Sequence, residues 1–346
     1  MTTTTNQKTV LVTGGSGFVG IHCILQLLQQ GYSVKTTVRS LNRKNTVLTR
    51  LENGGLTDFS QLGFIEADLT EDANWDHAVA GCDFVLHVAS PIGLSIPKDE
   101  NDMIRPAVDG TRRVLRAARD AGVKRVVMTS NFGAVGYSHT DTTQVITEES
   151  WTNPNEPGLS AYNKSKVLAE RAAWDFLKTE GGKLELTVIN PVGIFGPSLG
   201  PELSSGFELL KQILDGSMKR VPNMTLGLVD VRDVADLHIR AMTSPAGNGQ
   251  RFLAIAGETM TLPDIAQLMK DRLGNTLNHI STKRIPDWVV RLAALVNPTA
   301  RALVPMLSRY RTASNEKART LLGWKPRSNE EALLAAANSL IQFGYV

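Results

Sequence analysis

Short apolar runs alternate with helical patterns through the first half of the chain. The runs are rich in Val, Ile or Leu, as strands buried on both faces are, and lie at 9–12, 33–38, 63–66, 84–88, 125–129 and 184–189. The clearest helical pattern lies at 103–121, where Ile104, Val108, Thr111 and Leu115 form one stripe. This alternation predicts an α/β fold with a doubly wound parallel sheet and right-handed crossovers, the Rossmann type.

The pattern loosens after Pro191, where Gly, Pro and Ser cluster at 193–206. Helical pieces follow at 206–215 and 263–273, but 233–242 and 251–256 again predict a helix and a strand of the main sheet. We therefore expect a first domain over 1–190, with later returns near 228–257. The rest, 191–346, is expected to form a smaller, mostly helical region.

Composition excludes several classes of protein. Lys and Arg number 37 against 34 Asp and Glu, without a basic block, so neither a nucleic acid nor a membrane is expected as a partner. The two cysteines are far apart, which fits a reducing compartment, and we expect a cytoplasmic location. Residues 1–8 are polar and do not resemble a signal peptide. Histidine spacing indicates no metal site, and the oligomeric state stays open.

A glycine-rich turn follows the first predicted strand and precedes a predicted helix at 19–30. Gly14, Gly17 and Gly20 have GxxGxxG spacing, which permits a tight turn, close approach of phosphate, and close packing of the helix. The positive end of the helix then faces the anion. The sequence predicts a dinucleotide site here; a glycine-rich turn that binds nothing is the alternative.

The residue after the second strand indicates which dinucleotide is bound. A site for NAD usually carries Asp or Glu about 20 residues beyond the loop, whereas this chain has Arg39 there, with Arg43 and Lys44 close by. A guanidinium group can pair with a 2′-phosphate. The predicted cofactor is therefore NADP(H), unless Arg39 is an ordinary surface arginine.

Small or polar residues follow the other strands as well. Ligands of open parallel sheets bind beyond the carboxyl ends of the strands, so we expect these positions to contact the cofactor. The predicted cofactor-binding residues are Gly14, Ser16, Gly17, Phe18, Val19, Gly20, Arg39, Lys44, Asp68, Leu69, Val88, Ala89, Ser90, Tyr162, Lys166, Pro191, Val192 and Gly193.

A phenol and an ammonium group lie four residues apart in a helical stretch at 161–177. Tyr162 and Lys166 share one helix face. A nearby ammonium group is expected to lower the phenol pKa, so that Tyr162 exchanges a proton with a carbonyl oxygen. Lys166 is also expected to bind the nicotinamide ribose. Thr129, Ser130 and Asn131, at the end of the fifth strand, are candidates to donate a hydrogen bond to the same oxygen.

Together these motifs resemble the extended short-chain dehydrogenase/reductases, over nearly the whole chain. Within them the chain is most similar to the dihydroflavonol reductase, cinnamoyl-CoA reductase and microbial aldehyde/ketone reductase group. The resemblance rests on motifs at 10–20, 38–39, 87–91, 128–130, 162–166, 190–197, 229–235 and 322–326. It implies NADPH-dependent reduction of an aldehyde or ketone. One position departs from the family, since Asn131 stands where a catalytic serine is usual.

The sequence leaves two other functions open and predicts an apolar substrate pocket. The main alternative is an NAD-dependent nucleotide-sugar epimerase or dehydratase. Arg39 argues against it, because an NAD site usually carries Asp or Glu at this point of the chain. A further alternative is a cofactor-binding protein without catalytic activity. Asn131, at the position of the usual serine, supports this alternative, and the presence of Tyr162 and Lys166 argues against it. The predicted substrate-pocket residues, which ordinary core packing would explain about as well, are Ile92, Phe132, Leu203 and Phe207.

Overall fold

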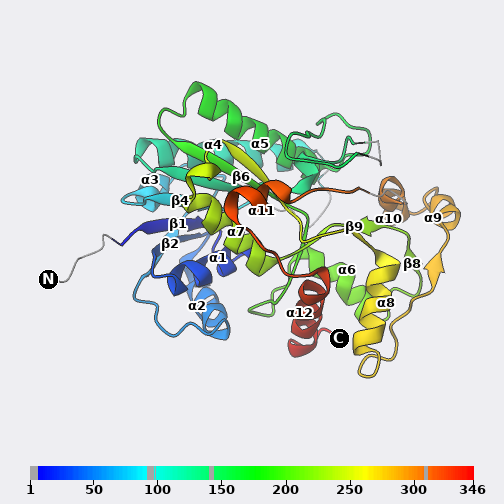
Figure 1. Cartoon of the computed structure of the whole chain (residues 1–346). Helices are drawn as coiled ribbons and strands as arrows, with labels where there is room; N and C mark the ends of the chain where they lie inside the picture. The colour runs from blue at the N-terminus through cyan, green and yellow to red at the C-terminus, as the bar shows by residue number, and fades with distance from the viewer. Residues whose placement is uncertain (1–6, 92–96, 98, 140–143, 308–310) are drawn as a thin grey trace.

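A seven-stranded sheet forms the centre of the computed structural model, which describes residues 7–91, 97, 99–139, 144–307 and 311–346. All of its strand pairs are parallel. In spatial order the strands are β11 (Gln250–Ala254), β6 (Glu185–Pro191), β5 (Arg125–Thr129), β4 (Phe84–His87), β1 (Thr9–Thr13), β2 (Ser33–Val38) and β3 (Leu62–Glu66). Helices cover both faces, and a smaller, mostly helical region lies beside them (Figure 1). The predicted fold class is confirmed.

The strand order reverses beside β1. β2 and β3 lie on one side of it, and β4, β5 and β6 on the other. β1 lies between β4 and β2, and its Val10, Leu11 and Val12 have no exposed surface, as expected of a strand buried on both faces. The reversal leaves a crevice at the carboxyl ends of β1 and β4, the usual ligand position of such sheets.

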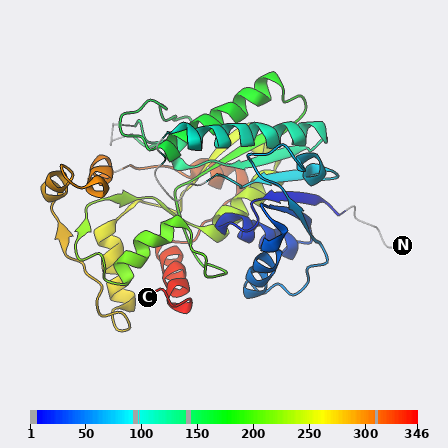
Figure 2. The same ribbon diagram turned by 180° about the vertical axis from the view of Figure 1, so that it is seen from behind.

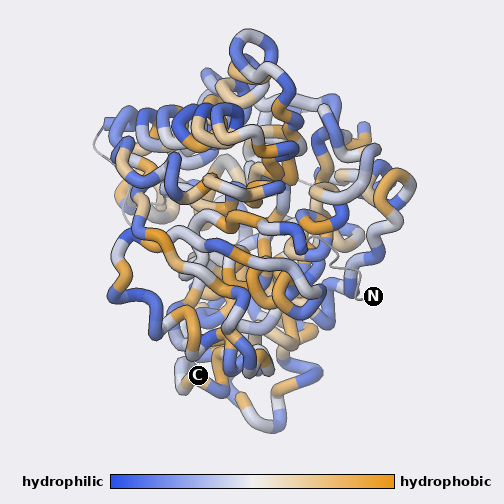
Figure 3. The backbone as a smooth tube through the Cα atoms, turned by 90° about the vertical axis from the view of Figure 1, so that its left-hand side faces the viewer, coloured by the Kyte–Doolittle hydropathy of each residue, from blue (hydrophilic) through white to orange (hydrophobic). Residues whose placement is uncertain are grey.

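Two pairs of helices cover the sheet. α1 (Phe18–Gln29) and α7 (Val231–Thr243) pack together on one face, and α4 (Asn101–Asp120) and α5 (Ala161–Thr179) on the other (Figures 1 and 2). Each face buries its own apolar cluster against the strands. Figure 3 shows hydrophobic stretches in the interior and hydrophilic ones at the periphery. The helix expected at 161–177 is thus packed beside α4 and against the sheet.

The smaller region has its own apolar core and short paired strands. β10 pairs with β7, β12 with β9, and β13 with β8. Its elements are β7 (Gly193–Phe195), α6 (Ser205–Leu214), β8 (Val221–Pro222), β9 (Thr225–Leu226), β10 (Leu228–Asp230), β12 (Met260–Thr261), α8 (Leu262–Leu273), β13 (Arg284–Ile285), α9 (Asp287–Ala293), α10 (Pro298–Leu303) and α12 (Asn329–Gln342). The chain returns to the main sheet through α7 and β11; the domain limits remain a prediction.

Several elements differ from the sequence expectation. The strand expected at 84–88 ends at His87, because Val88 turns its N–H to the Leu86 carbonyl at 3.1 Å and leaves the ladder. The sequence did not specify α2 (Lys44–Asn53), α3 (Trp75–Val79) or α11 (Glu316–Leu322), nor the 3₁₀ turns η1 (Leu41–Arg43), η2 (Phe132–Ala134), η3 (Pro245–Gly247) and η4 (Val304–Met306). Within the described residues, every helix is too short or too polar to cross a bilayer.

Candidate active site

The glycine-rich turn between β1 and α1 is held by backbone contacts. Gly14 has a φ of 74° and donates its N–H to Thr37 Oγ1 at 3.1 Å. A Cβ atom on Gly20 would lie 2.4 Å from the Gly14 carbonyl oxygen, so a side chain there is excluded. A Cβ atom on Gly15 would lie 2.0 Å from Thr36 Oγ1. Gly15 stands outside the predicted glycine spacing, and only the fold brings Thr36 beside it.

The N-terminus of α1 is open toward a ligand. Its N-cap residue, Gly17, has no side chain to accept from the first helical N–H groups, and these groups have no acceptor within the helix itself. The helix dipole adds positive potential at the same point. The N–H groups of Phe18, Val19 and Gly20 are therefore available to an anion, and their contact with the pyrophosphate stays a prediction.

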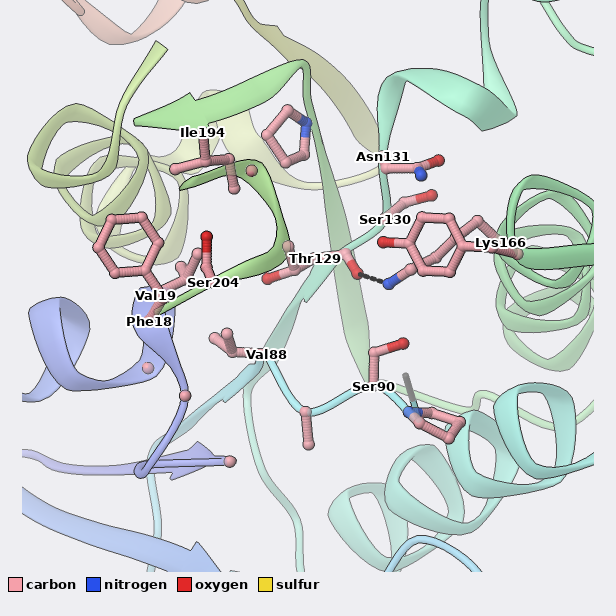
Figure 4. Close-up of a pocket in the computed structure, with 18 of the residues that line it drawn as sticks. Phe18, Val19, Val88, Ser90, Thr129, Ser130, Asn131, Lys166, Ile194 and Ser204 are labelled. Atoms are coloured by element: carbon pink, nitrogen blue, oxygen red, sulfur yellow. Dashed lines mark hydrogen bonds between the residues drawn. The ribbon is translucent and has the colours of Figure 1, made fainter. Parts of the chain in front are cut away.

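A cavity of about 1860 Å³ runs from this turn along the carboxyl ends of the strands. That volume exceeds the usual range for a small-molecule site, roughly 300–1,000 Å³, so it has room for a dinucleotide and a second ligand. All the predicted cofactor residues except Lys44 line it. Figure 4 shows Phe18 and Val19 on one side and Ser130, Asn131 and Lys166 on the other.

Lys44 is a correction to the predicted cofactor site. It is the first residue of α2, and its ammonium group lies 5.6 Å from the centre of the Phe64 ring, outside the cavity lining. The basic side chains that do line the cavity near Arg39 are Arg43 and Arg50. Arg43 was noted in the sequence but not assigned to the site.

Arg50 and Glu202 were missed because they meet only in the fold. Arg50 is 5% exposed and donates to the Ser16 carbonyl oxygen at 2.6 Å. Glu202, from the segment before α6, pairs with Arg50 at 2.9 Å and with Arg43 at 2.8 Å. These ion pairs link the smaller region to the glycine-rich turn across the cavity.

Tyr162 and Lys166 lie on α5, whose start is capped by Ser160 accepting from the Asn163 N–H at 3.2 Å. Lys166 Nζ lies 3.5 Å from the Thr129 carbonyl oxygen (Figure 4) and 5.9 Å from the centre of the Tyr162 ring. Lys166 is buried, which lowers its pKa to about 8, while the Glu170 carboxylate acts in the opposite direction. The ammonium form therefore predominates at neutral pH.

The pKa of Tyr162 differs from the sequence expectation. Burial raises it above the ordinary phenol value, with the Asn131 side chain lowering it and Tyr137 raising it further. Lys166 does not act in the expected way here because its ammonium group is directed at the end of β5. With its pKa raised, the phenol stays protonated at neutral pH and so holds the proton that a donor needs, but it is a weaker acid than an ordinary phenol.

Ser130 and Asn131 both reach the site, and both carry buried oxygen atoms that make no hydrogen bond within the described part of the chain. Ser130 is 2% exposed, and its free atom is Oγ. The free atom of Asn131 is Oδ1, while its Nδ2 donates to Asn163 Oδ1 at 3.3 Å. Buried polar atoms without partners are costly, so the site is built for a ligand that supplies them.

The substrate-pocket prediction is partly corrected. Phe132 and Leu203 line the cavity. Phe207 does not, because α6 turns it into the core of the smaller region, where it is fully buried 5.3 Å from the Phe18 ring, centre to centre. Ile92 lies outside the described residues. Lining residues that were not predicted include Tyr137, Ile255, Met306 and Arg311.

The sequence pattern of the NAD dependent epimerase/dehydratase family matches residues 10–256, from β1 to beyond β11. The chain belongs to this family. The match spans the glycine-rich turn, the Tyr162–Lys166 pair and the whole central sheet, and thus includes every residue proposed for chemistry.

Reductases are among the similar members of this family. Cinnamoyl-CoA reductase 1 of Arabidopsis thaliana is 38% identical over 251 residues, which are 71% of this chain and 70% of that protein. An anthocyanidin reductase ((2S)-flavan-3-ol-forming) of Vitis vinifera is 34% identical over 281 residues, or 77% and 81%. The yeast methylglyoxal/isovaleraldehyde reductase Gre2 complexed with NADPH is similar in structure, with a TM-score of 0.79, 28% identity and coverage of 98% and 100%.

Three features of the cavity fit a bound dinucleotide. The turn excludes side chains at Gly15 and Gly20, the N-terminus of α1 has free donors, and the buried oxygens of Ser130 and Asn131 lack partners. Among the described residues, no group of three or more His, Cys, Asp and Glu could hold a metal ion.

Proposed function

We propose that this protein is an NADPH-dependent carbonyl reductase that converts an aldehyde or ketone to an alcohol. The observation that carries the proposal is the position of Tyr162 and Lys166 beside the unsatisfied oxygens of Ser130 and Asn131, in the cavity that begins at the glycine-rich turn. Proton donor, cation and oxygen-binding groups thus share one cavity with a dinucleotide site.

The residues that would hold the cofactor follow the cavity. The N–H groups at the start of α1 would hold the pyrophosphate, Arg39 and Arg43 would pair with a 2′-phosphate, and Lys166 would hold the nicotinamide ribose. When bound, NADPH supplies a hydride to the carbonyl carbon.

The chain supplies the proton. Tyr162 donates its hydroxyl proton to the carbonyl oxygen, and the phenolate that remains is reprotonated from solvent. The second N–H of Asn131 Nδ2, whose first N–H is donated to Asn163, or the Ser130 hydroxyl donates a hydrogen bond to the same oxygen and stabilises the negative charge that develops there. Lys166 keeps a positive charge next to Tyr162 while the phenolate exists.

A spectrophotometric screen tests the proposal. The full chain is mixed with NADPH and, separately, with methylglyoxal, isovaleraldehyde, benzaldehyde and cinnamaldehyde, and loss of reduced nicotinamide absorbance is followed. We expect oxidation that depends on the carbonyl compound. If UDP-glucose is converted with NAD instead, and no carbonyl compound supports NADPH oxidation, the epimerase or dehydratase alternative is correct.

Replacing Arg39 by alanine tests the choice of cofactor. A hydrogen-bonded charge pair contributes on the order of 1.5–3 kcal/mol, which corresponds to roughly tenfold or more in affinity. We expect Arg39→Ala to raise the KM for NADPH by about that factor and to change the KM for NADH little. Lys44→Ala is the matched control, because Lys44 lies outside the cavity lining. Equal use of NADPH and NADH by the unmodified protein would refute this assignment.

A further inference from the structure

Glu170 is a fully buried carboxylate directly behind the proposed catalytic pair. It lies on α5, one turn after Lys166 and two turns after Tyr162, and has no exposed surface. Its Oε1 accepts from Arg251 Nε at 2.6 Å, and its Oε2 from Asn190 Nδ2 at 2.8 Å. The carboxylate does not line the cavity, and the proposed reaction gives it no direct part.

Arg251, on β11, fixes the carboxylate from the far side. It is 7% exposed, donates to the carbonyl oxygens of Glu148 at 2.6 Å and Ser150 at 2.9 Å, and lies 3.8 Å from the centre of the Trp151 ring. Buried ion pairs contribute little net stability compared with apolar packing. The pair therefore calls for an explanation other than stability alone.

Asn190 connects the carboxylate to the opposite side of the site. The Nδ2 group that donates to Glu170 also donates to the Asn131 carbonyl oxygen at 3.2 Å. Asn131 is the residue whose side chain faces Tyr162 and lowers its pKa. A single side chain on β6 thus joins the catalytic helix to the segment that presents Asn131.

The charged and titratable groups around Lys166 come from several elements. α5 contributes Tyr162 and Glu170, and β4 contributes His87, whose pKa is lowered to about 3 by burial and by Lys166. β5 contributes the Thr129 carbonyl, and Arg251 on β11 lies beyond Glu170. His87 is neutral at physiological pH. Glu170 is thus the carboxylate that favours the charged form of Lys166 and counteracts its burial.

We propose that Glu170 is a positioning residue with two roles: its charge keeps Lys166 an ammonium ion, and its bond through Asn190 holds Asn131 in place. The inference rests on the proposed function, because Lys166 and Asn131, which Glu170 would position, are catalytic groups of the proposed reaction. If Glu170 has these two roles, loss of its charge shifts the pH dependence of NADPH binding, and loss of its link to Asn131 lowers kcat. A merely structural ion pair predicts neither effect.

The pH prediction is tested with Glu170→Gln, which keeps the size of the side chain and removes its charge. Without that charge Lys166 loses its proton at lower pH. We expect the pH above which NADPH affinity falls, measured by fluorescence titration of the full chain, to move downward, and the alkaline limb of kcat/KM to move with it. Glu170→Asp keeps the charge and should leave both near their wild-type positions.

Glu148→Gln is the matched control. Glu148 is buried at the other end of the same network, where Oε1 accepts from the Leu253 N–H at 2.9 Å, and does not act on Lys166. It should lower the melting temperature without moving either pH limb. Two results would overturn the role of the charge. Either the pH limbs of NADPH affinity and kcat/KM stay at their wild-type positions in Glu170→Gln, or they shift equally in Glu148→Gln.

Asn190→Ala tests the second role and removes no charge, so it keeps the inference testable if Glu170→Gln does not fold. We expect kcat with the best aldehyde of the screen to fall roughly tenfold, in keeping with loss of a hydrogen bond that orients a neighbour, while NADPH affinity and its pH limb stay unchanged. A wild-type kcat would overturn the link to Asn131. Absence of any carbonyl reduction by the wild-type chain would instead refute the proposed function, whereas the NADPH titration tests the charge of Glu170 independently.

Discussion

Replacing Tyr162 by phenylalanine is expected to lower kcat for aldehyde reduction by roughly a hundredfold to ten-thousandfold, the usual contribution of general acid catalysis. The substitution removes only the hydroxyl group, which is the proton donor of the proposed reaction. Burial keeps that hydroxyl protonated at neutral pH, so the proton to be donated is present before the substrate binds. Steady-state rates with a saturating aldehyde measure the effect.

NADPH binding is the control for Tyr162→Phe. The phenyl ring retains the packing of α5, so fluorescence titration should give an affinity close to that of the wild type. A variant that binds NADPH and still reduces an aldehyde at nearly the wild-type rate would show that Tyr162 is not the acid. Lys166→Met, in contrast, should weaken NADPH binding too, because the ammonium group is assigned to the ribose.

Asn131→Ala is expected to have the second-largest effect, a loss of roughly a hundredfold to a thousandfold in kcat, as for removal of an oxyanion-type donor. Asn131 is favoured over Ser130 because its side chain also acts on Tyr162. Asn131→Ser should keep or raise activity, since it restores the usual residue of the family, and Ser130→Ala should change kcat little.

The opposite ranking would reassign this role. If Ser130→Ala is crippling and Asn131→Ala mild, the buried Ser130 hydroxyl holds the substrate oxygen. If neither substitution changes kcat, Tyr162 alone contacts that oxygen, and the buried free atoms of both residues serve another purpose.

The main sheet could be predicted from sequence because most of its strands are short segments rich in Val, Ile or Leu, such as β1 and β4. The glycine-rich turn was equally accessible, since the spacing of Gly14, Gly17 and Gly20 between a strand and a helix has few other uses. Sequence order also placed the ends of β4, β5 and β6 at one edge, because parallel strands end on the same side. That rule brought Ser130 and Val88 to the cavity.

What the sequence did not provide depends on contacts between distant segments. Glu202 pairs with Arg50 across 152 positions of the chain, and no local pattern marks such a partner. Phe207 lies on an apolar helix face, but periodicity does not tell whether that face meets a cavity or a core. The raised pKa of Tyr162 follows from burial, which is a property of the fold. The link from Glu170 to Asn131 through Asn190 joins α5, β6 and the segment after β5.

Transfer of deuterium from cofactor to product tests the central claim most directly. NADPH labelled with deuterium at the transferable C4 position is incubated with the full chain and an aldehyde, and the alcohol is analysed by mass spectrometry. A carbonyl reductase places the label on the carbinol carbon, so we predict an alcohol one mass unit heavier with one labelled face of the nicotinamide and unlabelled with the other. Failure of either labelled form to give deuterated alcohol, with intact NADPH recovered at the end, would contradict the account.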